Sequence, residues 1–341
     1  MLVLGVETSC DETAIGIVED RFALRANVVA SQAQLHGPYG GVVPEVAARA
    51  HLDLMLPTID RALVEAGAHL SDIDAIAVTA GPGLAGALLV GVSAAKGLAL
   101  ARDVPLVGVN HLRAHVEAAQ LEVGALDPPL AALVVSGGHT SIVVMDADGS
   151  FRQLGATIDD AAGEAFDKIA RFLGLGYPGG PEIDRLSQGG NPRAYHFPRA
   201  MLHDGTYDLS LSGLKTAVIR ELRRLEAVGE EPVLADVAAS FQEAIVDVQA
   251  IKTLRAVADE GLEQVVLAGG VAANRRLRAR MQADCDERGL RLIVPSIPLC
   301  TDNGAMVAAS GANLLAAGHL DDLSLAVDPN LPLAVATEPP G

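Results

Sequence analysis

Two histidines, His111 and His115, are spaced so that a helix would place them side by side. Residues four apart lie on one helical face, close enough for both imidazoles to bind one divalent metal ion. Asp302, directly before a predicted helix, is the candidate third ligand, because two histidines and a carboxylate suit Fe(II), Zn(II) or Mn(II) acting as a Lewis acid. The alternatives are helix-end or surface positions for the histidines and capping of the following helix for Asp302.

Three glycine turns form a second group of candidate residues. Ser136-Gly137-Gly138, Gly179-Gly180 and Gly269-Gly270 each lie beside a predicted strand or helix start. Glycine lets a ligand approach the backbone closely, and N–H groups at a turn or a helix N-terminus attract phosphate. Neither a P-loop nor a GxGxxG motif occurs, so we expect a nucleotide site of another kind. An ordinary hairpin turn is the alternative interpretation of each turn taken singly.

Carboxylates gather near the same turns. Asp11 lies in the first predicted hairpin, where an anion-binding turn would disfavour a negative charge unless a metal ion or a proton transfer were involved. Asp167 and Asp184 flank Gly179-Gly180 and are candidates to bind sugar hydroxyls. Partnership with a helix dipole is the ordinary explanation for the acidic residues around 159–160.

The chain is acidic, with a formal net charge of −18. Such a charge repels phosphate backbones on average, so a nucleic acid must meet a local basic patch or a helper protein. Solvated helix faces are the ordinary explanation for clustered arginines, and a patch for an RNA backbone is the alternative. The clusters lie on two predicted helices, Arg220, Arg223 and Arg224 on one and Arg275, Arg276, Arg278 and Arg280 on the other.

The elements that must position these residues alternate between strands and helices. Apolar, β-branched runs predict strands at residues 2–6, 13–19, 75–79, 105–109, 130–135, 140–146, 264–268 and 290–294. Helical spacing predicts helices over residues 45–66, 84–101, from about 111, and over 161–173, 213–226, 234–260, 272–287 and 303–317. Each half opens with a strand, a polar or glycine-rich turn and a second strand, which indicates a duplicated α/β architecture with a cleft between two lobes.

Length and composition narrow the class of protein. The 341 residues suit two domains of ~150 residues each, and 50% hydrophobic residues are ample for buried cores. Three cysteines without a CxxC pair argue against a disulfide framework and a thiolate zinc site. The N-terminus lacks the pattern of a signal peptide, and segment 84–101 fits a buried helix better than a membrane span. We therefore expect a cytoplasmic protein with no membrane association.

Taken together, the motifs resemble those of one family. In chain order they are VETSCDET (6–13), GPGL (81–84), NHLRAH (110–115), SGGHT (136–140), DAAGEAFDK (160–168) and LAGGVAAN (267–274). The series resembles the bacterial TsaD family of tRNA threonylcarbamoyladenosine synthase subunits, once described as sialoglycoprotein endopeptidases. The resemblance covers about residues 2–315 and leaves out the tail.

The resemblance implies a fold and a reaction. The fold is a two-lobed actin/Hsp70/sugar-kinase-like (ASKHA) α/β fold, with residues 1–125 as the N-terminal lobe and 126–300 as the C-terminal lobe. The helix at about 303–317 is expected to pack near the N-terminal lobe, and the Pro-rich tail, 320–341, to form a surface strap or a loose end. The reaction transfers the threonylcarbamoyl group from threonylcarbamoyl-adenylate to the exocyclic amine of adenosine 37 in tRNAs that read ANN codons, forming t6A and releasing AMP.

The resemblance also implies site residues by position. His111, His115 and Asp302 would hold one divalent metal ion, Fe(II) foremost and Zn(II) second. Asp11 is our candidate base for the proton that the amine loses. The family often has an acid and a glycine between the histidines, whereas this chain has Arg113 and Ala114, which puts in question the tuning of the metal rather than its binding. The adenylate would be held by Val134, Val135, Ser136, Gly137, Gly138, Asp167, Gly180, Asp184 and Asn274.

The implied partners are tRNA, a small TsaB-like paralogue and a TsaE-like ATPase, with a separate synthase supplying the adenylate. A homodimer stays open, because the same apolar helices could serve either assembly. Three other functions also stay open. A small-molecule kinase of the same fold would leave the two histidines without a role, and a noncatalytic nucleotide-binding scaffold would need no metal. A metallopeptidase has a metal site but no HExxH motif and no placed base or nucleophile.

Overall fold

The chain divides into two compact units, and the computed structural model describes residues 1–333. The first unit comprises Met1–Leu126 with the described residues from Pro295 onward, and the second comprises Asp127–Val294. Residues 295–300, which we expected in the C-terminal lobe, therefore belong to the first unit. They are held there because Leu299 is buried in an apolar cluster with Val3 and Ala305.

The first unit is built around a five-stranded sheet. Its 3-10 helices are η1 (Gly37–Tyr39) and η2 (Leu70–Asp72). Its strands and α-helices are β1 (Leu2–Glu7), β2 (Glu12–Glu19), β3 (Ala23–Ser31), α1 (Ala33–His36), α2 (Pro44–Ala66), β4 (Ala75–Gly81), α3 (Ala85–Arg102), β5 (Leu106–Asn110), α4 (His111–Glu117), α5 (Gln120–Val123), α11 (Ile297–Cys300) and α12 (Gly304–Ala316).

The second unit has its own five-stranded sheet. A 3-10 helix, η3 (Gly270–Ala273), follows one of its strands directly. Its strands and α-helices are β6 (Leu130–Val135), β7 (Thr140–Met145), β8 (Phe151–Ala156), α6 (Ala162–Phe172), α7 (Gly179–Ser187), α8 (Ser212–Val228), α9 (Leu234–Asp259), β9 (Gln264–Ala268), α10 (Arg275–Arg288) and β10 (Arg291–Ile293).

The two sheets share one topology. The strand order is β3-β2-β1-β4-β5 in the first unit and β8-β7-β6-β9-β10 in the second. In each sheet the first two strands form an antiparallel hairpin and the third extends it antiparallel at one edge. The fourth and fifth strands run parallel to the first. The duplication predicted from the sequence is therefore confirmed at the level of strand order and direction.

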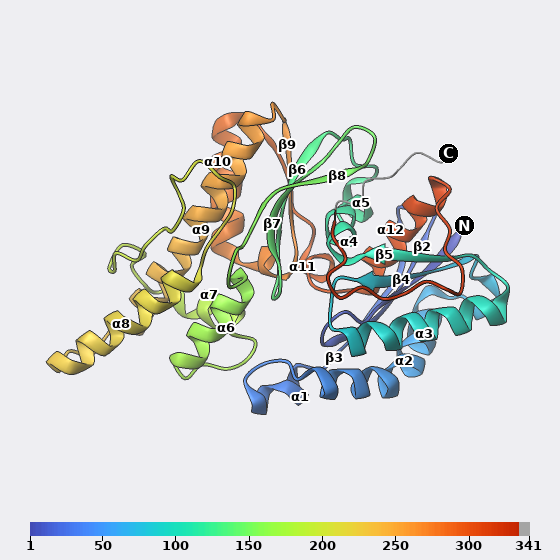
Figure 1. Ribbon diagram of the computed structural model, residues 1–341, viewed down its shortest axis with the longest axis horizontal. Helices are drawn as coiled ribbons and strands as arrows, with labels where there is room; N and C mark the ends of the chain where they lie inside the picture. Colours follow the sequence, from blue (N-terminus) through green and yellow to red (C-terminus); the bar gives the residue numbers. More distant parts are fainter. Residues whose placement is uncertain (334–341) are drawn as a thin grey trace. The chain divides into compact units, whose positions relative to one another are not determined.

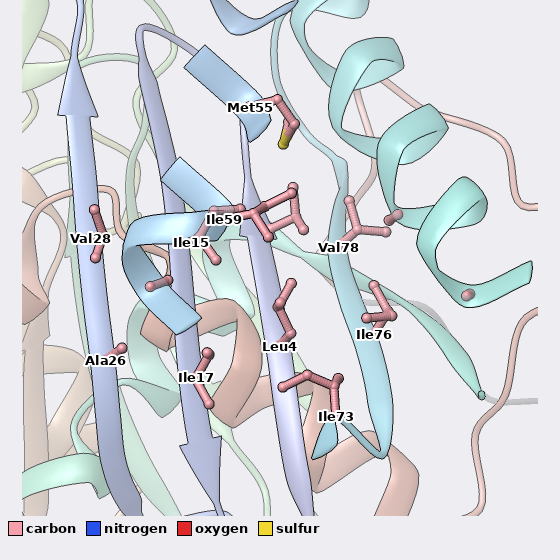
Figure 2. Close-up of a cluster of buried hydrophobic side chains, with 14 of the residues drawn as sticks. Leu4, Ile15, Ile17, Ala26, Val28, Met55, Ile59, Ile73, Ile76 and Val78 are labelled. Atoms are coloured by element: carbon pink, nitrogen blue, oxygen red, sulfur yellow. The ribbon is translucent and has the colours of Figure 1, made fainter. Parts of the chain in front are cut away.

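Helices cover both faces of the first sheet (Figure 1). On one face α2 packs on β2 and β3 while α3 packs on β4, and on the other face α12 packs on β1, β2 and β4. Figure 2 shows the core on the α2 side, where Leu4, Ile15 and Ile17 of the sheet lie close to Met55 and Ile59 of α2. Burial of these side chains, worth about 25 cal/mol per Å² of apolar surface, fixes the strands whose ends carry the site.

Most predicted elements are present, with ends shifted by one or two residues. Two strands, β3 and β8, were not predicted. Both lie at sheet edges and expose polar side chains such as Arg25 and Arg152, so they lack the continuous apolar run of a buried strand. The helix α7 was also missed, because Gly179-Gly180, interpreted as a turn, forms its first residues.

The helix α3 is, by length and composition alone, long and apolar enough to cross a membrane. In the fold one of its faces packs on β4 and α2 through side chains that include Leu88, Val92 and Ala95. Its other face exposes Leu89 and Leu100. The segment expected to be a buried helix is therefore buried along one face.

The C-terminal strap, which we define as residues 320–333, lies along β5 and the end of β4. The backbone of Asp321 pairs with β5, and its Oδ2 accepts a hydrogen bond from Gly108 N–H at 2.8 Å. Farther along, Asp328 N–H donates to a carbonyl near the end of β4 at 2.9 Å. The remainder of the predicted tail, 334–341, lies outside the described residues.

Candidate active site

The helix α4 presents both predicted histidine ligands. His111 Nε2 lies 3.6 Å and His115 Nε2 lies 3.1 Å from Asp302 Oδ1. The three ligand atoms all lie within 4.8 Å of one another. Both histidine side chains are buried, whereas Asp302 is 20% exposed. The structure thus brings the three residues together, although 187 positions separate His115 from Asp302.

A buried carboxylate orients His111. Glu7, at the end of β1, accepts a hydrogen bond from Thr79 Oγ1 at 2.6 Å, and its Oε2 lies 3.1 Å from His111 Nδ1. Ser9 Oγ lies 3.2 Å from the same nitrogen. Burial disfavours charge on the imidazole, but the Glu7 and Asp302 carboxylates outweigh it and raise the pKa of His111 to about 9. With Nδ1–H donated to Glu7, Nε2 is directed to the side of Asp302.

This donor set fits a divalent metal ion. The raised pKa of His111 indicates a negative potential that favours a cation between its Nε2 and Asp302. Binding of a metal ion must displace the proton from Nε2, so we expect metal affinity to increase with pH. Two imidazoles and one carboxylate suit Fe(II) or Zn(II) and leave coordination positions for other ligands.

Local sequence explains why the ligands stand where they do. Asn110 ends β5 and caps α4, because its Oδ1 accepts from two N–H groups of the first turn at 2.9 and 3.2 Å. Asn303, and not Asp302, caps α12 by accepting from Met306 N–H at 2.9 Å. The capping role considered for Asp302 is therefore wrong, and its carboxylate faces the two histidines.

The departure at Arg113 has a structural role. Its guanidinium makes two hydrogen bonds to Glu117, Nε to Oε2 at 3.2 Å and Nη2 to Oε1 at 3.1 Å. Glu117 is buried, and Ser310 Oγ of α12 also donates to it. A buried carboxylate needs such partners. The pair ties α4 to α12, the two helices that flank the three ligands.

Asp11 lies in the turn between β1 and β2, next to Glu12. Burial first, and then the carboxyl of Asp11, raise the pKa of Glu12 to about 9. Glu12 therefore keeps its proton at neutral pH and can donate a hydrogen bond to Asp11, while its Oε1 accepts from Ser31 Oγ at 3.0 Å. The charge of Asp302 also contributes to the raised pKa of Glu12 and of Cys10, so this turn lies near the metal ligands.

The proton on Glu12 predicts a pH-dependent stability. The folded chain holds this proton between pH 4.5 and about 9 and the unfolded chain does not, so this group lowers stability as pH rises through that window. We expect Glu12→Gln, which keeps a neutral donor, to melt about 2–4 °C higher relative to the unsubstituted chain at pH 8 than at pH 5. Thermal unfolding at the two pH values measures this difference. An equal difference at both would contradict the buried proton.

In the second unit, the turn at residues 136–138 has the features of an anion cradle. Ser136 N–H donates within the turn, to His139 O at 2.7 Å. The N–H groups of Gly137 and Gly138 have no hydrogen-bond partner among the described residues, and a Cβ at either position would meet none of their atoms within 4 Å. Open space therefore adjoins two N–H groups that are available to a phosphate.

Close backbone approaches hold this turn in place. Gly269 follows β9 with a φ of +89°, and a Cβ there would lie 2.4 Å from Val135 O. A Cβ on Gly163 of α6 would lie 2.7 Å from Gly137 Cα. Val134 pairs in register with Ala268 of β9. The ends of β6 and β9 and the start of α6 are thus packed around the turn.

The other predicted adenylate contacts lie on helices of the same unit. Asp167 Oδ1 accepts from Gly179 N–H at 2.6 Å, at the first residue of α7. Gly180, the next residue, faces space that no described atom fills within 4 Å. Asp184, in the last part of α7, accepts from Arg275 Nε at 2.7 Å. One oxygen of each carboxylate is therefore already used within the protein.

Four side chains, which we call the buried relay, connect the predicted contacts Asn274 and Asp184 through Gln242 and Ser187. Asn274 caps α10, and its Nδ2 donates to Gln242 Oε1 at 2.7 Å. Gln242 Nε2 donates to Ser187 Oγ at 2.9 Å, and Ser187 Oγ donates to the carbonyl of Asp184 at 2.9 Å. All donors point the same way along the chain of bonds, which fixes the orientation of both amides.

The arginines considered as a basic patch are largely compensated on α10. The ion pairs are Arg275 with Asp184, Arg276 with Glu243, and Arg280 with both Asp247 and Asp284. Within the described part of the chain, Arg220 and Arg223 of α8 form no ion pair. Most of the positive charge of α10 is therefore matched by carboxylates of the same unit.

Sequence reasoning missed Glu7, Gln242 and Ser187 as members of these sites. A signal existed for Glu7, because a carboxylate that ends a continuous apolar strand must be paired if it is buried. Gln242 was marked in the same way by its apolar neighbours on α9. Ser187 carried no comparable signal, because serine is common near helix ends.

Comparison with known proteins decides the family. Residues 23–309 match the family TsaD, described as tRNA N6-adenosine threonylcarbamoyltransferase. The chain belongs to this family. The tRNA N6-adenosine threonylcarbamoyltransferase of Ralstonia pickettii is 51% identical over 320 residues, which cover 93% of this chain and 92% of the relative. That of Geobacillus thermodenitrificans is 53% identical over 332 residues, which cover 97% of this chain and 96% of the relative.

These matches confirm the resemblance drawn from the motifs. The chain is a member of a family of transferases that make t6A on tRNA. The resemblance and the sequence motifs agree over most of the chain, so the TsaD motifs can be placed on the structure residue by residue. The metal ligands and the glycine turn fall in the first and second unit, respectively.

Solved structures confirm the fold class. Full-length HypF in its phosphate- and nucleotide-bound form matches with a TM-score of 0.60 at 15% identity, covering 91% of this chain and 46% of that chain. The activator of 2-hydroxyisocaproyl-CoA dehydratase from Clostridium difficile with bound ADPNP matches with a TM-score of 0.55 at 15% identity, covering 93% and 97%. At these identities the likeness shows the fold alone, which is the expected ASKHA type with a duplicated sheet.

Proposed function

We propose that this TsaD-family chain transfers the threonylcarbamoyl group with a metal ion in its first unit and the adenylate in its second. The acceptor is the exocyclic amine of adenosine 37 in tRNAs that read ANN codons. The bond from the carbonyl carbon to the phosphate oxygen breaks, a C–N bond forms, AMP leaves, and the amine loses one proton. The cluster of His111, His115 and Asp302 in a chain of this family supports the proposal most strongly.

The residues of the first unit divide the work. A divalent metal ion held by His111, His115 and Asp302 would supply Lewis-acid stabilisation of negative charge on the acyl group, with Fe(II) as first candidate and Zn(II) as second. Glu7 holds the tautomer of His111 that keeps Nε2 available. Asp11 accepts the proton that the amine loses.

The second unit binds the nucleotide. The N–H groups of Gly137 and Gly138 are placed to bind the phosphate, and Gly180 leaves room beside them. Asp184 and Asn274 contact the nucleoside from α7 and from the start of α10. A mixed anhydride needs little further activation, so holding it at a fixed position contributes most to the rate.

The buried relay predicts that Gln242 affects nucleotide affinity without touching the nucleotide. Gln242→Leu has a similar volume but removes two hydrogen bonds and leaves Asn274 and Ser187 unpaired. We expect AMP affinity to fall about tenfold, the effect of roughly 1.4 kcal/mol. Isothermal titration with AMP measures it, with Gln282→Leu on the exposed side of α10 as the matched control. Undiminished AMP affinity in Gln242→Leu would show that the relay does not position the contacts.

A TsaB-like paralogue is our proposed partner of the first unit, and the apolar faces of α2 and α3 are its proposed docking surface. Leu52 and Leu56 on α2 are 65% and 69% exposed, and Leu89 on the neighbouring α3 is 54% exposed. We expect Leu56→Asp with Leu89→Asp to weaken association at least tenfold, because a charge would be buried in an apolar interface. Analytical ultracentrifugation with the paralogue measures it, and Val228→Asp in the second unit is the control. Unchanged association would place the interface elsewhere.

The function itself is tested by product analysis. Purified chain is incubated with threonylcarbamoyl-adenylate and an unmodified ANN-reading tRNA, with and without the TsaB-like and TsaE-like subunits, in a cytoplasmic buffer as the proposed compartment. Mass spectrometry of the digested tRNA is expected to show t6A. Absence of t6A even with the partners, alongside ATP-dependent phosphorylation of a small molecule, would favour a kinase.

A further inference from the structure

The C-terminal strap reaches the element that carries the metal ligands. Asn110 Nδ2 donates to Leu331 O at 3.3 Å and to Pro332 O at 3.1 Å. The Oδ1 of the same side chain caps α4, whose first residue is His111. One amide therefore joins the strap to the first turn of the metal-binding helix, and its two ends cannot move independently.

A second connection runs from the strap to His111 through a turn. Gly83 N–H donates to Pro329 O of the strap at 3.1 Å. The next residue, Leu84, donates its N–H to Ser9 O at 2.8 Å, and Ser9 Oγ lies 3.2 Å from His111 Nδ1. The strap thus supports both the helix that bears His111 and the residue that faces its second nitrogen.

The strap is fitted closely to the sheet at two glycines. A Cβ on Gly81 would lie 1.9 Å from Asp328 O, and a Cβ on Gly108 would lie 2.8 Å from a methyl carbon of Leu325. Leu325 and Val327 also pack against the apolar core on the α2 side. These contacts fix the path of the strap over β4 and β5, so that it can act as a rigid support.

We propose that the C-terminal strap is a positioning element of the metal centre, which acts through Asn110 and Ser9 to set the direction of His111. The inference rests on the proposed metal-binding role of His111, His115 and Asp302. Groups that orient metal ligands typically change metal affinity 10–100-fold when they are lost. A strap that only covered apolar surface would change stability and leave metal affinity unaltered.

Titration of the full-length chain with Co(II), followed by its visible absorption, tests the proposal. Asn110→Ser keeps a hydroxyl that can cap α4 but cannot donate to the strap carbonyls. Asp321→Ala with Leu325→Ala removes two anchors of the strap and leaves Asn110 intact. We expect each variant to lower Co(II) affinity about tenfold and to alter the absorption spectrum. Ser324→Ala, whose hydroxyl donates within the strap to Asp322, is the matched control with unchanged affinity.

Each outcome decides the point. Wild-type Co(II) affinity in both variants would overturn the proposal, and thermal unfolding confirms that each variant is folded. A loss confined to Asn110→Ser would assign the effect to the cap residue and likewise overturn the role of the strap. Failure of the unsubstituted chain to bind Co(II) would instead refute the metal site on which the proposal rests.

Discussion

Replacement of His115 by alanine is expected to remove the bound metal ion and to lower the rate of threonylcarbamoyl transfer by about 10³-fold or more. His115 supplies one of two imidazole ligands, and its Nε2 lies 3.1 Å from Asp302 Oδ1. With one histidine and one carboxylate left, the site loses most of its affinity, and a Lewis acid is worth several kcal/mol of transition-state stabilisation. Metal analysis of the purified chain and single-turnover kinetics measure the two effects.

Two further variants separate loss of the ligand from loss of the fold. His115→Gln keeps much of the buried volume but offers no imidazole, so it should lose metal and activity like His115→Ala. His69→Ala changes an exposed histidine of the same unit and should alter neither. A His115→Gln chain that retains one metal ion and the full transfer rate would exclude His115 as a ligand.

Asp11→Asn is expected to slow the transfer step by about 10²–10⁴-fold, the usual effect of losing a general base. The amide has the size of the carboxylate but cannot accept the proton that leaves the amine of adenosine. Tight binding of tRNA and adenylate should persist, because the substitution removes little contact surface. Single-turnover kinetics with saturating tRNA measures the chemical step directly.

Glu12→Gln is the matched control for Asp11→Asn. The raised pKa of Glu12, to about 9, means that this residue is already neutral at pH 7, and glutamine reproduces a neutral hydrogen-bond donor. We expect its transfer rate to stay within about threefold of the unsubstituted chain. An Asp11→Asn chain with the full single-turnover rate would remove Asp11 from the mechanism.

Much of the fold could be predicted from the sequence because its central strands are buried on both faces. The strands β1, β2, β6 and β7 appear as continuous apolar runs joined by short turns, and this pattern alone predicts two hairpins in a repeat. The edge strands β3 and β8 could not be predicted in this way, because an edge strand faces water and alternates irregularly.

The path of the C-terminal strap was not predictable either. Its attachment uses backbone groups, such as Asp328 N–H and Pro329 O, which carry no signature in the sequence. The two side chains that fix it, Asp321 and Leu325, have no periodic pattern around them. The proline content indicated a segment outside helices and strands, and nothing more.

The candidate metal site was partly predictable. The spacing of His111 and His115 is a local property of one helix, so the sequence predicts that they share a face. Asp302 comes from a distant segment, and the sequence alone could not tell it from a helix cap. The structure decides this point through Asn303, which caps α12 in its place.

The buried relay shows the opposite case. Its members lie on three helices, with 55 residues between Ser187 and Gln242 and 32 between Gln242 and Asn274. Hydrogen bonds of this kind depend on tertiary packing, and no local pattern specifies them. The sequence identified Asp184 and Asn274 through the family motifs, but it could not show what holds them in position.

The most direct test of the account is a single-turnover transfer with threonylcarbamoyl-adenylate that carries labelled threonine. The metal-loaded chain, its partner subunits and an unmodified ANN-reading tRNA are mixed, and labelled tRNA and AMP are measured together. We predict that label appears on adenosine 37 with one AMP released per label transferred, and that both products disappear in the His115→Gln chain. Label that stays off the tRNA, or transfer at the full rate by the His115→Gln chain, would contradict the account.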